Sequence, residues 1–448
     1  MIVIIGLGTA GVYATRWITQ LNREEEITII EKHAYESYSP CGIPLIFEES
    51  GDFNVLKHPF PRTKRINVLL NHEAIKVDPE NKIVRVRDIE KNTEKEIGYD
   101  KLLFAAGADP LVPPIKNARE YLGNGVFVVK TLEDADLIKK FIGEKNVKSV
   151  AVIGAGAIGL EMAHSMLVNG IKVHVFEMFP QVFPRALDPD MADIVAKFIM
   201  GLGIELHLSS RVDEIVVENG KIKGIVSSGK TYECESVILA TGVVPNTKIL
   251  DGIVKMERNF ILVNERMETS RKDIFAAGDC VLVKSFINGD PVAIQLATTA
   301  AKQGIVAGIN MAGKDATYSG ALGAFVSTIG SLEVAAVGFT ETYLKDKVEV
   351  VSARARALDK PDYAGGEEII LKVVAEKSTG KILGAQALGK KASSKIDIIS
   401  MAMKKGSTAM DLSSVEISYC PAVSELYDVV NMAGDLLLRK LNPENYRF

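Results

Sequence analysis

Short apolar runs alternate with helical patterns in the first half of the chain. Four runs contain at most one polar side chain each: residues 2–5, 27–30, 150–153 and 173–176. Continuous apolar runs of this length are typical of strands that a sheet buries on both faces. Segments of helical period follow the first and the third run, at residues 12–21 and 160–168. The order strand, helix, strand therefore occurs twice and predicts two parallel α/β units.

Two further patterns interrupt and then end this arrangement. Between residues 66 and 100, strand signals alternate with turns at residues 78–81 and 91–93, which predicts β-hairpins. From about residue 317 the chain has no nucleotide motif and reads as an α+β unit. Its strand-like and helical segments are residues 334–338, 369–374, 382–386, 395–405 and 422–433.

These patterns predict an α/β fold with two Rossmann-like dinucleotide-binding domains and a C-terminal α+β domain. A linker with Pro110, Pro113 and Pro114 follows the first part, and the chain returns to the first domain after residue 244. The expected segments are 1–111 and 245–316 for the first nucleotide domain, 112–244 for the second, and 317–448 for the C-terminal domain.

Composition narrows the class of protein. The 448 residues are 47% hydrophobic and 25% charged, with a formal net charge of −4, which is ordinary globular material. Without a long basic run, nucleic acid and anionic membranes are poor partners. No apolar stretch has the length of a membrane span. The first residues read as a buried strand rather than a signal peptide. Because the four cysteines are scattered and form no disulfide scaffold, a cytoplasmic, reducing location is expected. The six histidines lack metal-ligand spacing, and no metal is expected.

The first α/β unit contains the motif Gly6-Leu7-Gly8-Thr9-Ala10-Gly11 between its strand and its helix. In a dinucleotide fingerprint, the first glycine makes a tight turn, the second lets the backbone approach a pyrophosphate, and the third lets helix and strand pack closely. The helix N-terminus offers N–H groups to the phosphates. Glu31 ends the second strand and can accept hydrogen bonds from ribose hydroxyls.

The second unit repeats the motif as Gly154-Ala155-Gly156-Ala157-Ile158-Gly159, and its second strand ends in Glu177. An acidic residue here favours a free ribose 2′-hydroxyl and repels a 2′-phosphate. NADH is therefore the expected donor in preference to NADPH. His174 alternates within this strand, and we expect it to face solvent.

Two nucleotide sites and the Gly278-Asp279 strand end imply a flavin, which needs an acceptor for its electrons. The segment Ser37-Tyr38-Ser39-Pro40-Cys41-Gly42-Ile43-Pro44 offers one. Cys41 has no nearby second cysteine, and position 46, where a dithiol enzyme of this layout has its partner, is Ile46. The four cysteines (Cys41, Cys234, Cys280 and Cys420) do not form a disulfide scaffold. Cys41 is the expected redox-active thiol.

Together these motifs resemble the FAD-dependent pyridine nucleotide–disulfide oxidoreductases over essentially the whole chain. The resemblance is to the single-cysteine branch, which contains coenzyme A–disulfide reductases, NADH oxidases, NADH peroxidases and persulfide reductases. It implies FAD on the first unit and NAD(P)H on the inserted one. It also implies a homodimer in which the C-terminal domain covers the partner's active site.

The resemblance assigns roles to individual residues. Glu31 would bind the adenosine ribose of FAD, Asp279 the ribityl chain, and Ala297 and Thr298 the flavin edge. Ser37 and Cys41 would flank the flavin. Tyr363 and Tyr419 would reach the other subunit's cysteine, as a proton donor or as interface packing. The full set of expected cofactor-binding residues is Gly6, Gly8, Thr9, Ala10, Gly11, Glu31, Lys32, Ser37, Ala108, Gly154, Gly156, Ile158, Gly159, Glu161, Glu177, Gly242, Asp279, Ala297 and Thr298.

Two departures leave the substrate open. Thr9 stands where well-known NADH oxidases and peroxidases have a histidine, which counts against a peroxidase. The residues that bind coenzyme A phosphates are poorly matched, because the first helix has Tyr13 and Trp17, with only Arg16 and Arg23 as loose candidates.

The expected reaction passes electrons from NADH through FAD to Cys41, whose thiolate attacks a small disulfide or persulfide. The alternatives are an NADH oxidase reducing dioxygen, an electron-transfer reductase for a small redox protein, and a flavoprotein that serves as a binding module. Cys420 adjoins Tyr419 and is a competing candidate for the reactive thiol.

Overall fold

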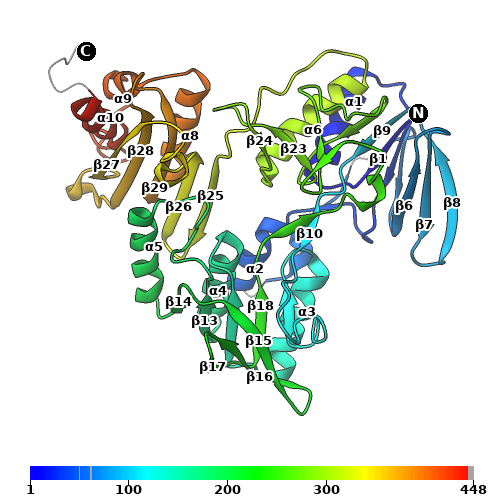
Figure 1. Ribbon diagram of the computed structural model, residues 1–448, viewed down its shortest axis with the longest axis horizontal. Coiled ribbons are helices and arrows are strands. Elements are labelled where there is room, and N and C mark those ends of the chain that lie inside the picture. Colours follow the sequence, from blue (N-terminus) through cyan, green and yellow to red (C-terminus); the bar gives the residue numbers. More distant parts are fainter. Residues whose placement is uncertain (50, 61–62, 442–448) are drawn as a thin grey trace. The chain divides into compact units, whose positions relative to one another are not determined.

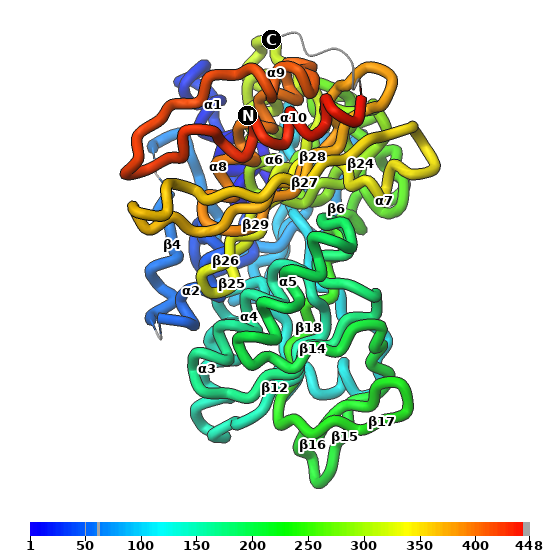
Figure 2. The backbone as a smooth tube through the Cα atoms, turned by 90° about the vertical axis from the view of Figure 1, so that its left-hand side faces the viewer, coloured from blue at the N-terminus to red at the C-terminus, as the bar shows by residue number. Residues whose placement is uncertain are grey.

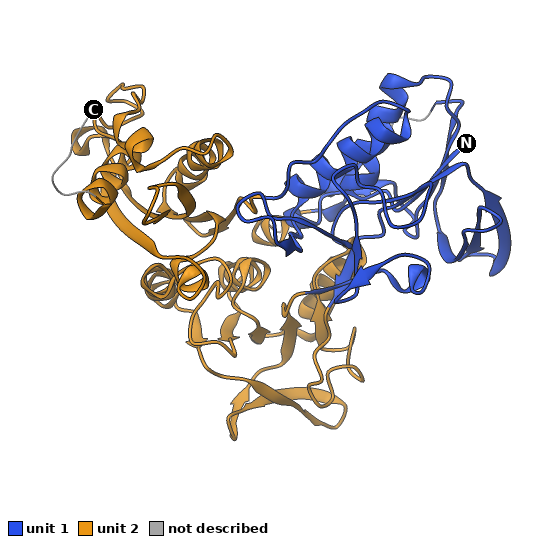
Figure 3. Ribbon diagram, turned by 45° about the horizontal axis from the view of Figure 1, so that its top comes forward, with its two compact units in different colours: residues 1–43, 52–110, 243–321 blue, residues 44–51, 111–242, 322–448 orange. Residues whose placement is uncertain are grey.

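The computed structural model describes residues 1–49, 51–60 and 63–441. Within these residues the chain forms two compact units (Figure 3). The first unit comprises Met1–Ile43, Asp52–Pro110 and Val243–Ala321, and the second comprises Pro44–Gly51, Leu111–Gly242 and Leu322–Phe448. Among the described residues, no helix combines the length and the apolar character that crossing a membrane requires.

The first unit is built on a five-stranded parallel sheet (Figure 1). Its strands, in spatial order, are β22 (Ile274–Ala276), β9 (Lys101–Phe104), β1 (Ile2–Ile5), β2 (Ile27–Ile30) and β5 (Ile66–Leu69). β1 and β2 are buried at every position, which explains their continuous apolar sequence. The predicted α/β fold is confirmed for this unit.

Two helices of this unit touch through their backbones. A Cβ atom on Gly304 of α6 (Ala297–Met311) would lie 2.3 Å from the carbonyl oxygen of Ala10 in α1 (Thr9–Leu21). A Cβ on Gly308 would lie 2.5 Å from the carbonyl oxygen of Ala14. No larger side chain fits between the helices, so the small residues of α6 are a packing requirement.

The remaining strands of the first unit form small sheets. The predicted hairpins are present as β6 (His72–Asp78), β7 (Ile83–Asp88) and β8 (Thr93–Gly98), paired antiparallel. The other elements are β3 (Ser37–Tyr38), η1 (Pro40–Gly42), η2 (Phe53–Leu56), β4 (Lys57–His58), β10 (Ala108–Pro110), β19 (Val243–Pro245), η3 (Lys248–Leu250), β20 (Met256–Glu257), β21 (Phe260–Leu262), β23 (Val281–Lys284) and β24 (Pro291–Val292).

The second unit contains the second Rossmann-like sheet, also parallel. Its strands, in spatial order, are β11 (Val126–Val128), β18 (Ser236–Leu239), β12 (Ser149–Ile153), β13 (Lys172–Phe176) and β14 (Glu205–His207). Its other elements are α2 (Ile43–Glu48), α3 (Leu132–Lys145), α4 (Ala157–Val168), α5 (Pro189–Gly201), β15 (Val212–Glu218), β16 (Lys221–Ser227) and β17 (Lys230–Glu233).

The expectation that His174 faces solvent is wrong. His174 lies in β13 and is only 6% exposed. β13 pairs with β12 on one side and β14 on the other, and positions 173–176 are all buried. In a parallel strand covered on both faces, alternation along the sequence does not separate a solvent face from a core face.

The C-terminal part of the second unit is an antiparallel sheet with helices (Figure 2). Its elements are β25 (Phe325–Ile329), β26 (Leu332–Gly338), α7 (Glu341–Leu344), β27 (Val350–Leu358), η4 (Asp362–Ala364), β28 (Glu368–Glu376), β29 (Ile382–Gly389), α8 (Ala392–Lys404), α9 (Ala409–Ser414) and α10 (Val429–Leu441).

The helix predicted over residues 422–433 begins later than expected. Residues 421–428 are turns and irregular backbone, and α10 starts at Val429. The Asp428 carboxylate accepts a hydrogen bond from the Val430 N–H (2.9 Å) and forms a buried ion pair with Lys395. This cap and ion pair fix the start of the helix.

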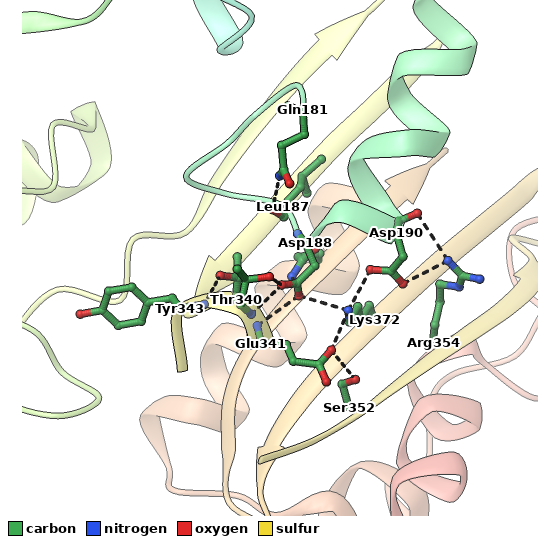
Figure 4. A network of polar contacts seen from close by, with 12 residues as sticks. Gln181, Leu187, Asp188, Asp190, Thr340, Glu341, Tyr343, Ser352, Arg354 and Lys372 are labelled. Atoms are coloured by element: carbon green, nitrogen blue, oxygen red, sulfur yellow. Dashed lines mark hydrogen bonds and ion pairs between the residues drawn. The ribbon is translucent and has the colours of Figure 1, made fainter. Parts of the chain in front are cut away.

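A buried ion-pair network joins α5 to the C-terminal sheet (Figure 4). The Lys372 ammonium is 3.2 Å from Asp188, 2.8 Å from Asp190 and 2.9 Å from Glu341, and its side chain is 7% exposed. Asp188 also accepts hydrogen bonds from the Thr342 N–H (2.9 Å) and hydroxyl (2.8 Å). Burial alone raises the pKa of Asp188, but these hydrogen bonds and the Lys372 charge outweigh it and lower the pKa.

Replacing Lys372 with methionine removes the cation and leaves the Asp188 carboxylate buried. We expect Lys372→Met to lower the free energy of unfolding by about 3–5 kcal/mol at neutral pH, measured by urea unfolding followed by circular dichroism. Because the pKa of Asp188 is lowered in the folded state, its carboxylate stabilises the fold at pH values above the usual pKa of 3.8. This contribution is lost as the pH falls through the folded-state pKa. The deficit of the variant should therefore shrink toward acid pH.

Lys377→Met is the matched control. Lys377 pairs with Glu349 at 2.5 Å, and both side chains are more than half exposed. This substitution should change the stability by no more than about 0.5 kcal/mol. Equal effects of the two substitutions would contradict the importance of the network.

Candidate functional site

The first fingerprint loop leaves open space at one glycine only. A Cβ on Gly6 would lie 2.4 Å from the Ala105 carbonyl oxygen, and one on Gly11 would lie 2.1 Å from the Gly6 carbonyl oxygen. At Gly8 no atom lies within 4 Å. Gly8 also precedes α1 without a side-chain cap. The loop therefore has the bare backbone and open face that a pyrophosphate needs, which fits FAD.

The second fingerprint loop has the same geometry. A Cβ on Gly154 would lie 2.3 Å from the Ala240 carbonyl oxygen, and one on Gly159 would lie 2.0 Å from the Gly154 carbonyl oxygen, whereas Gly156 has no atom within 4 Å. Gly156 precedes α4 without a side-chain cap. Ile158, in the first turn of α4, is exposed. This loop is therefore equally suited to a dinucleotide phosphate.

Each strand-end acid clamps its own fingerprint loop. One Glu31 carboxylate oxygen accepts a hydrogen bond from the Leu7 N–H (2.7 Å), and the other accepts one from the His33 N–H (3.0 Å). Glu177 does the same with the Ala155 N–H (2.9 Å) and the Phe179 N–H (2.9 Å). The sequence predicted only ribose contacts for these acids. Their equal positions after the second strand were the signal that could have revealed the clamp.

Asp279 lies beside the first fingerprint loop. It follows β22 and Gly278, whose φ is +93° and whose Cβ would lie 3.4 Å from the Ala10 Cβ. The Gly278 N–H donates to the buried Gln303 side chain at 2.7 Å. Gln303, which no sequence motif indicated, thus holds this turn against α6.

The start of α6 is available to a ligand. Ala297 and Thr298 are both exposed in its first turn, and the preceding Leu296 provides no side-chain cap. Because α6 packs on α1, the structure brings these two residues, Asp279 and the first loop into one unit.

Four other predicted cofactor-binding residues lie outside the two fingerprint loops and differ from one another in burial and contacts. Ala108 is buried in β10, and Lys32 is exposed with its ammonium 3.4 Å from Asp109. Gly242 has a φ of +105°, and a Cβ atom there would have no neighbouring atom within 4 Å. Glu161 is bonded to the Ser327 hydroxyl at 2.6 Å, and its burial raises its pKa. The carboxylate of Glu161 is therefore engaged with β25.

Cys41 is exposed in the 3-10 turn η1. A short antiparallel strand pair supports this turn, because Ser37 of β3 pairs with His58 of β4 and the Ser39 N–H donates to the Leu56 carbonyl at 3.0 Å. The Ser39 hydroxyl also lies 2.7 Å from the His58 ring. The exposed thiol thus lies on a turn that hydrogen bonds from Ser39 attach to residues 56 and 58.

The four cysteines, all within the described residues, fall into two classes and none is in a disulfide. Cys234 and Cys280 are buried, and burial raises the pKa of each thiol to about 12. Neither can form a thiolate at neutral pH. Only Cys41 and Cys420 are exposed, so they are the two candidates for thiol chemistry.

Tyr363 and Tyr419 come from different loops of the C-terminal part and meet. Tyr363 lies in η4 and is 81% exposed. The two tyrosines are close enough to interact, and the interaction with Tyr363 is the main reason that the pKa of Tyr419 is raised. Large exposed side chains of the same region include Val423 and Leu426. We call Tyr363, Tyr419, Val423 and Leu426 the tyrosine surface.

Comparisons with known proteins agree over nearly the whole chain. The NADH oxidase of Methanocaldococcus jannaschii is 39% identical over 98% of this chain and 99% of its own length. The NAD(P)H sulfur oxidoreductase (CoA-dependent) of Pyrococcus abyssi is 33% identical over 95% of this chain and 96% of its own. The NAD-dependent persulfide reductase from A. fulgidus superposes with a TM-score of 0.94 at 29% identity, covering 99% of this chain and 83% of that one.

Two family models match the chain in succession. The pyridine nucleotide–disulphide oxidoreductase model matches residues 1–304, and the dimerisation domain of the same family matches residues 325–430. The first match contains both fingerprint loops and Cys41, and the second contains both tyrosines. The chain therefore belongs to the pyridine nucleotide–disulphide oxidoreductase family and is an FAD-dependent NAD(P)H oxidoreductase.

Proposed function

We propose that this chain is a homodimeric, NADH-dependent reductase of small disulfides or persulfides in which Cys41 is the redox-active thiol. The observation that carries the proposal is the single exposed cysteine of the first unit, which lies on a supported turn while Cys280 of the same unit is buried. Relatives named as a CoA-dependent sulfur oxidoreductase and a persulfide reductase support the substrate class.

The bound cofactors supply hydride transfer from the nicotinamide and electron transfer to sulfur. The chain's own residues bind and orient them. Gly8 and Gly156 let the two pyrophosphates approach the backbone, and Glu31 and Glu177 hold the loops in shape while offering oxygen to ribose. Ala297 and Thr298 lie at the exposed start of α6, where they can contact the flavin edge.

Cys41 performs the sulfur chemistry. Its thiolate attacks one sulfur of the substrate disulfide or persulfide, the substrate S–S bond breaks, and the second sulfur leaves as a thiolate or as hydrosulfide. Two electrons from NADH then reduce the mixed disulfide on Cys41, which releases the bound thiol and restores the thiolate. The lone reactive thiol suits a reducing compartment, so we also infer a cytoplasmic location.

The tyrosine surface completes the site in the dimer. Tyrosine hydroxyls are protonated at neutral pH, and the pKa of Tyr419 is raised further, so the Tyr363–Tyr419 pair can donate a proton to the leaving sulfur. Because this surface lies in the region matched by the family's dimerisation domain, we assign it to the other subunit's Cys41.

An NADH oxidase that reduces dioxygen is the second candidate, because the M. jannaschii relative has that name. Thr9 stands where well-known oxidases and peroxidases have a histidine, which counts against a peroxidase. Anaerobic NADH oxidation with coenzyme A disulfide, coenzyme A persulfide and polysulfide, compared with an aerobic control, distinguishes the candidates. Fast turnover with oxygen alone would replace the first proposal with the second.

Cys41→Ser keeps the size of the side chain and removes the thiolate. The variant should retain FAD and its reduction by NADH. In the native protein, two-electron reduction should give a broad long-wavelength absorbance from charge transfer between the Cys41 thiolate and the flavin, and the variant should lose this band. Its turnover of disulfide or persulfide should fall at least about a thousandfold, which is roughly 4 kcal/mol of barrier. Cys420→Ser is the control and should cost less than about tenfold. Normal disulfide reduction by Cys41→Ser would refute the mechanism.

Glu177→Gln tests nucleotide choice. Removing the negative charge should shift the ratio of kcat/KM values toward NADPH by about 1–2 kcal/mol, the scale of one charged hydrogen bond. Glu218→Gln, an exposed acid on β15, is the control and should leave the ratio unchanged. A native protein that prefers NADPH tenfold would contradict the assignment of Glu177.

Leu426→Glu tests the dimer. Leu426 is 69% exposed on the tyrosine surface, and a charge introduced into an apolar interface disfavours association. The variant should sediment as a monomer, retain flavin reduction by NADH, and lose disulfide turnover. Val168→Glu, at the exposed end of α4, should remain a dimer. A monomeric variant with full disulfide turnover would show that the partner's tyrosine surface is dispensable.

A further inference from the structure

Three metal-binding side chains meet at one edge of the second Rossmann-like sheet. β13 and β14 are parallel neighbours, with His174 opposite Glu205 and Phe176 opposite His207. His174 Nδ1 lies 3.3 Å from His207 Nε2 and 3.2 Å from one Glu205 carboxylate oxygen, Oε2. One ligand atom from each of the three residues lies within 4.8 Å of the others. The other Glu205 oxygen, Oε1, pairs with Lys172 at 2.8 Å.

The three side chains are of the kinds that bind zinc. Imidazole nitrogen and carboxylate oxygen are both usual zinc ligands in proteins. His174 is buried, with 6% of its surface exposed, whereas the Glu205 side chain is about half exposed. The set therefore offers two imidazole nitrogens and one carboxylate oxygen at a site that is open to solvent on the Glu205 side.

Two of the three separations between these atoms match a tetrahedral metal. With metal–nitrogen distances of about 2.0–2.1 Å, two ligands of tetrahedral zinc lie about 3.3–3.4 Å apart. The separations of His174 Nδ1 from His207 Nε2 and from Glu205 Oε2, 3.3 Å and 3.2 Å, are close to this length. Aromatic rings line one side, because the His207 ring stacks on Phe176 at 4.5 Å and meets the Tyr232 ring edge-on at 4.7 Å.

We propose that His174, Glu205 and His207 form a site for a divalent transition-metal cation, with Zn²⁺ as the best match and water as the fourth ligand. Spacing along the sequence did not predict this site, because its members lie on two strands and meet only through their pairing. The His207 carbonyl accepts the Glu177 N–H at 2.9 Å. A cation here would therefore brace the strand edge that presents Glu177.

The test uses the full-length, FAD-loaded Cys41→Ser/Cys420→Ser protein, so that exposed thiols do not compete for the metal. Titration calorimetry with Zn²⁺ should detect one ion per chain with a dissociation constant of about 10 µM or below. His174→Gln in this background should weaken binding about 100-fold or more, since loss of even an outer partner of a ligand costs 10–100-fold. Zn²⁺ should also raise the unfolding temperature of the background protein and not of the variant.

His58→Gln is the control, because His58 is exposed and lies in the first unit. It should leave Zn²⁺ binding unchanged. If His174→Gln fails to fold, as judged by FAD content and circular dichroism, Glu205→Gln replaces it, since that side chain is about half exposed. Binding weaker than about 10 µM, or binding that the site variants leave within tenfold, would overturn the proposal.

Discussion

Both nucleotide sites depend on a contact between backbones that only glycine permits. In each fingerprint, the third glycine would place a Cβ 2.0–2.1 Å from the carbonyl oxygen of the first. Any side chain there would push the helix away from its strand and move the helix N-terminus that faces the phosphates. The Glu31 and Glu177 clamps act on the same loops from the other side, by holding the N–H of the second fingerprint residue. The shape of each loop is thus fixed by contacts within the protein.

These contacts leave the middle glycine of each loop as the open position. Gly8 and Gly156 have no neighbouring atom within 4 Å of a Cβ, and neither helix that follows has a side-chain cap. Glu31 and Glu177 are buried, and hydrogen bonds from the backbone fix the orientation of each carboxylate. The repetition of one arrangement in two units explains how a single chain can hold a flavin and a nicotinamide with the same local chemistry.

Burial limits thiol chemistry to two of the four cysteines. Cys234 and Cys280 have pKa values raised to about 12, which removes them as nucleophiles, while Cys41 and Cys420 are exposed. In the C-terminal part, the exposed side chains that matter are large and mostly apolar. Tyr363, Tyr419, Val423 and Leu426 are large and exposed in a domain that matches a dimerisation domain. An exposed apolar surface of this kind is typical of an interface.

The sequence by itself determined what is local: both fingerprint loops, the acids that follow them, the parallel strands and the lone Cys41. These features follow from spacing within about 30 residues, because a βαβ unit is that long. The tertiary structure decided what depends on pairing between distant segments. Strand order buried His174 and placed it beside Glu205 and His207, and packing of α5 on the C-terminal sheet surrounded Lys372 with three carboxylates. It also brought Tyr363 to Tyr419 and delayed the start of α10 to Val429. Such contacts join residues far apart in the chain, and no periodicity along the sequence encodes them.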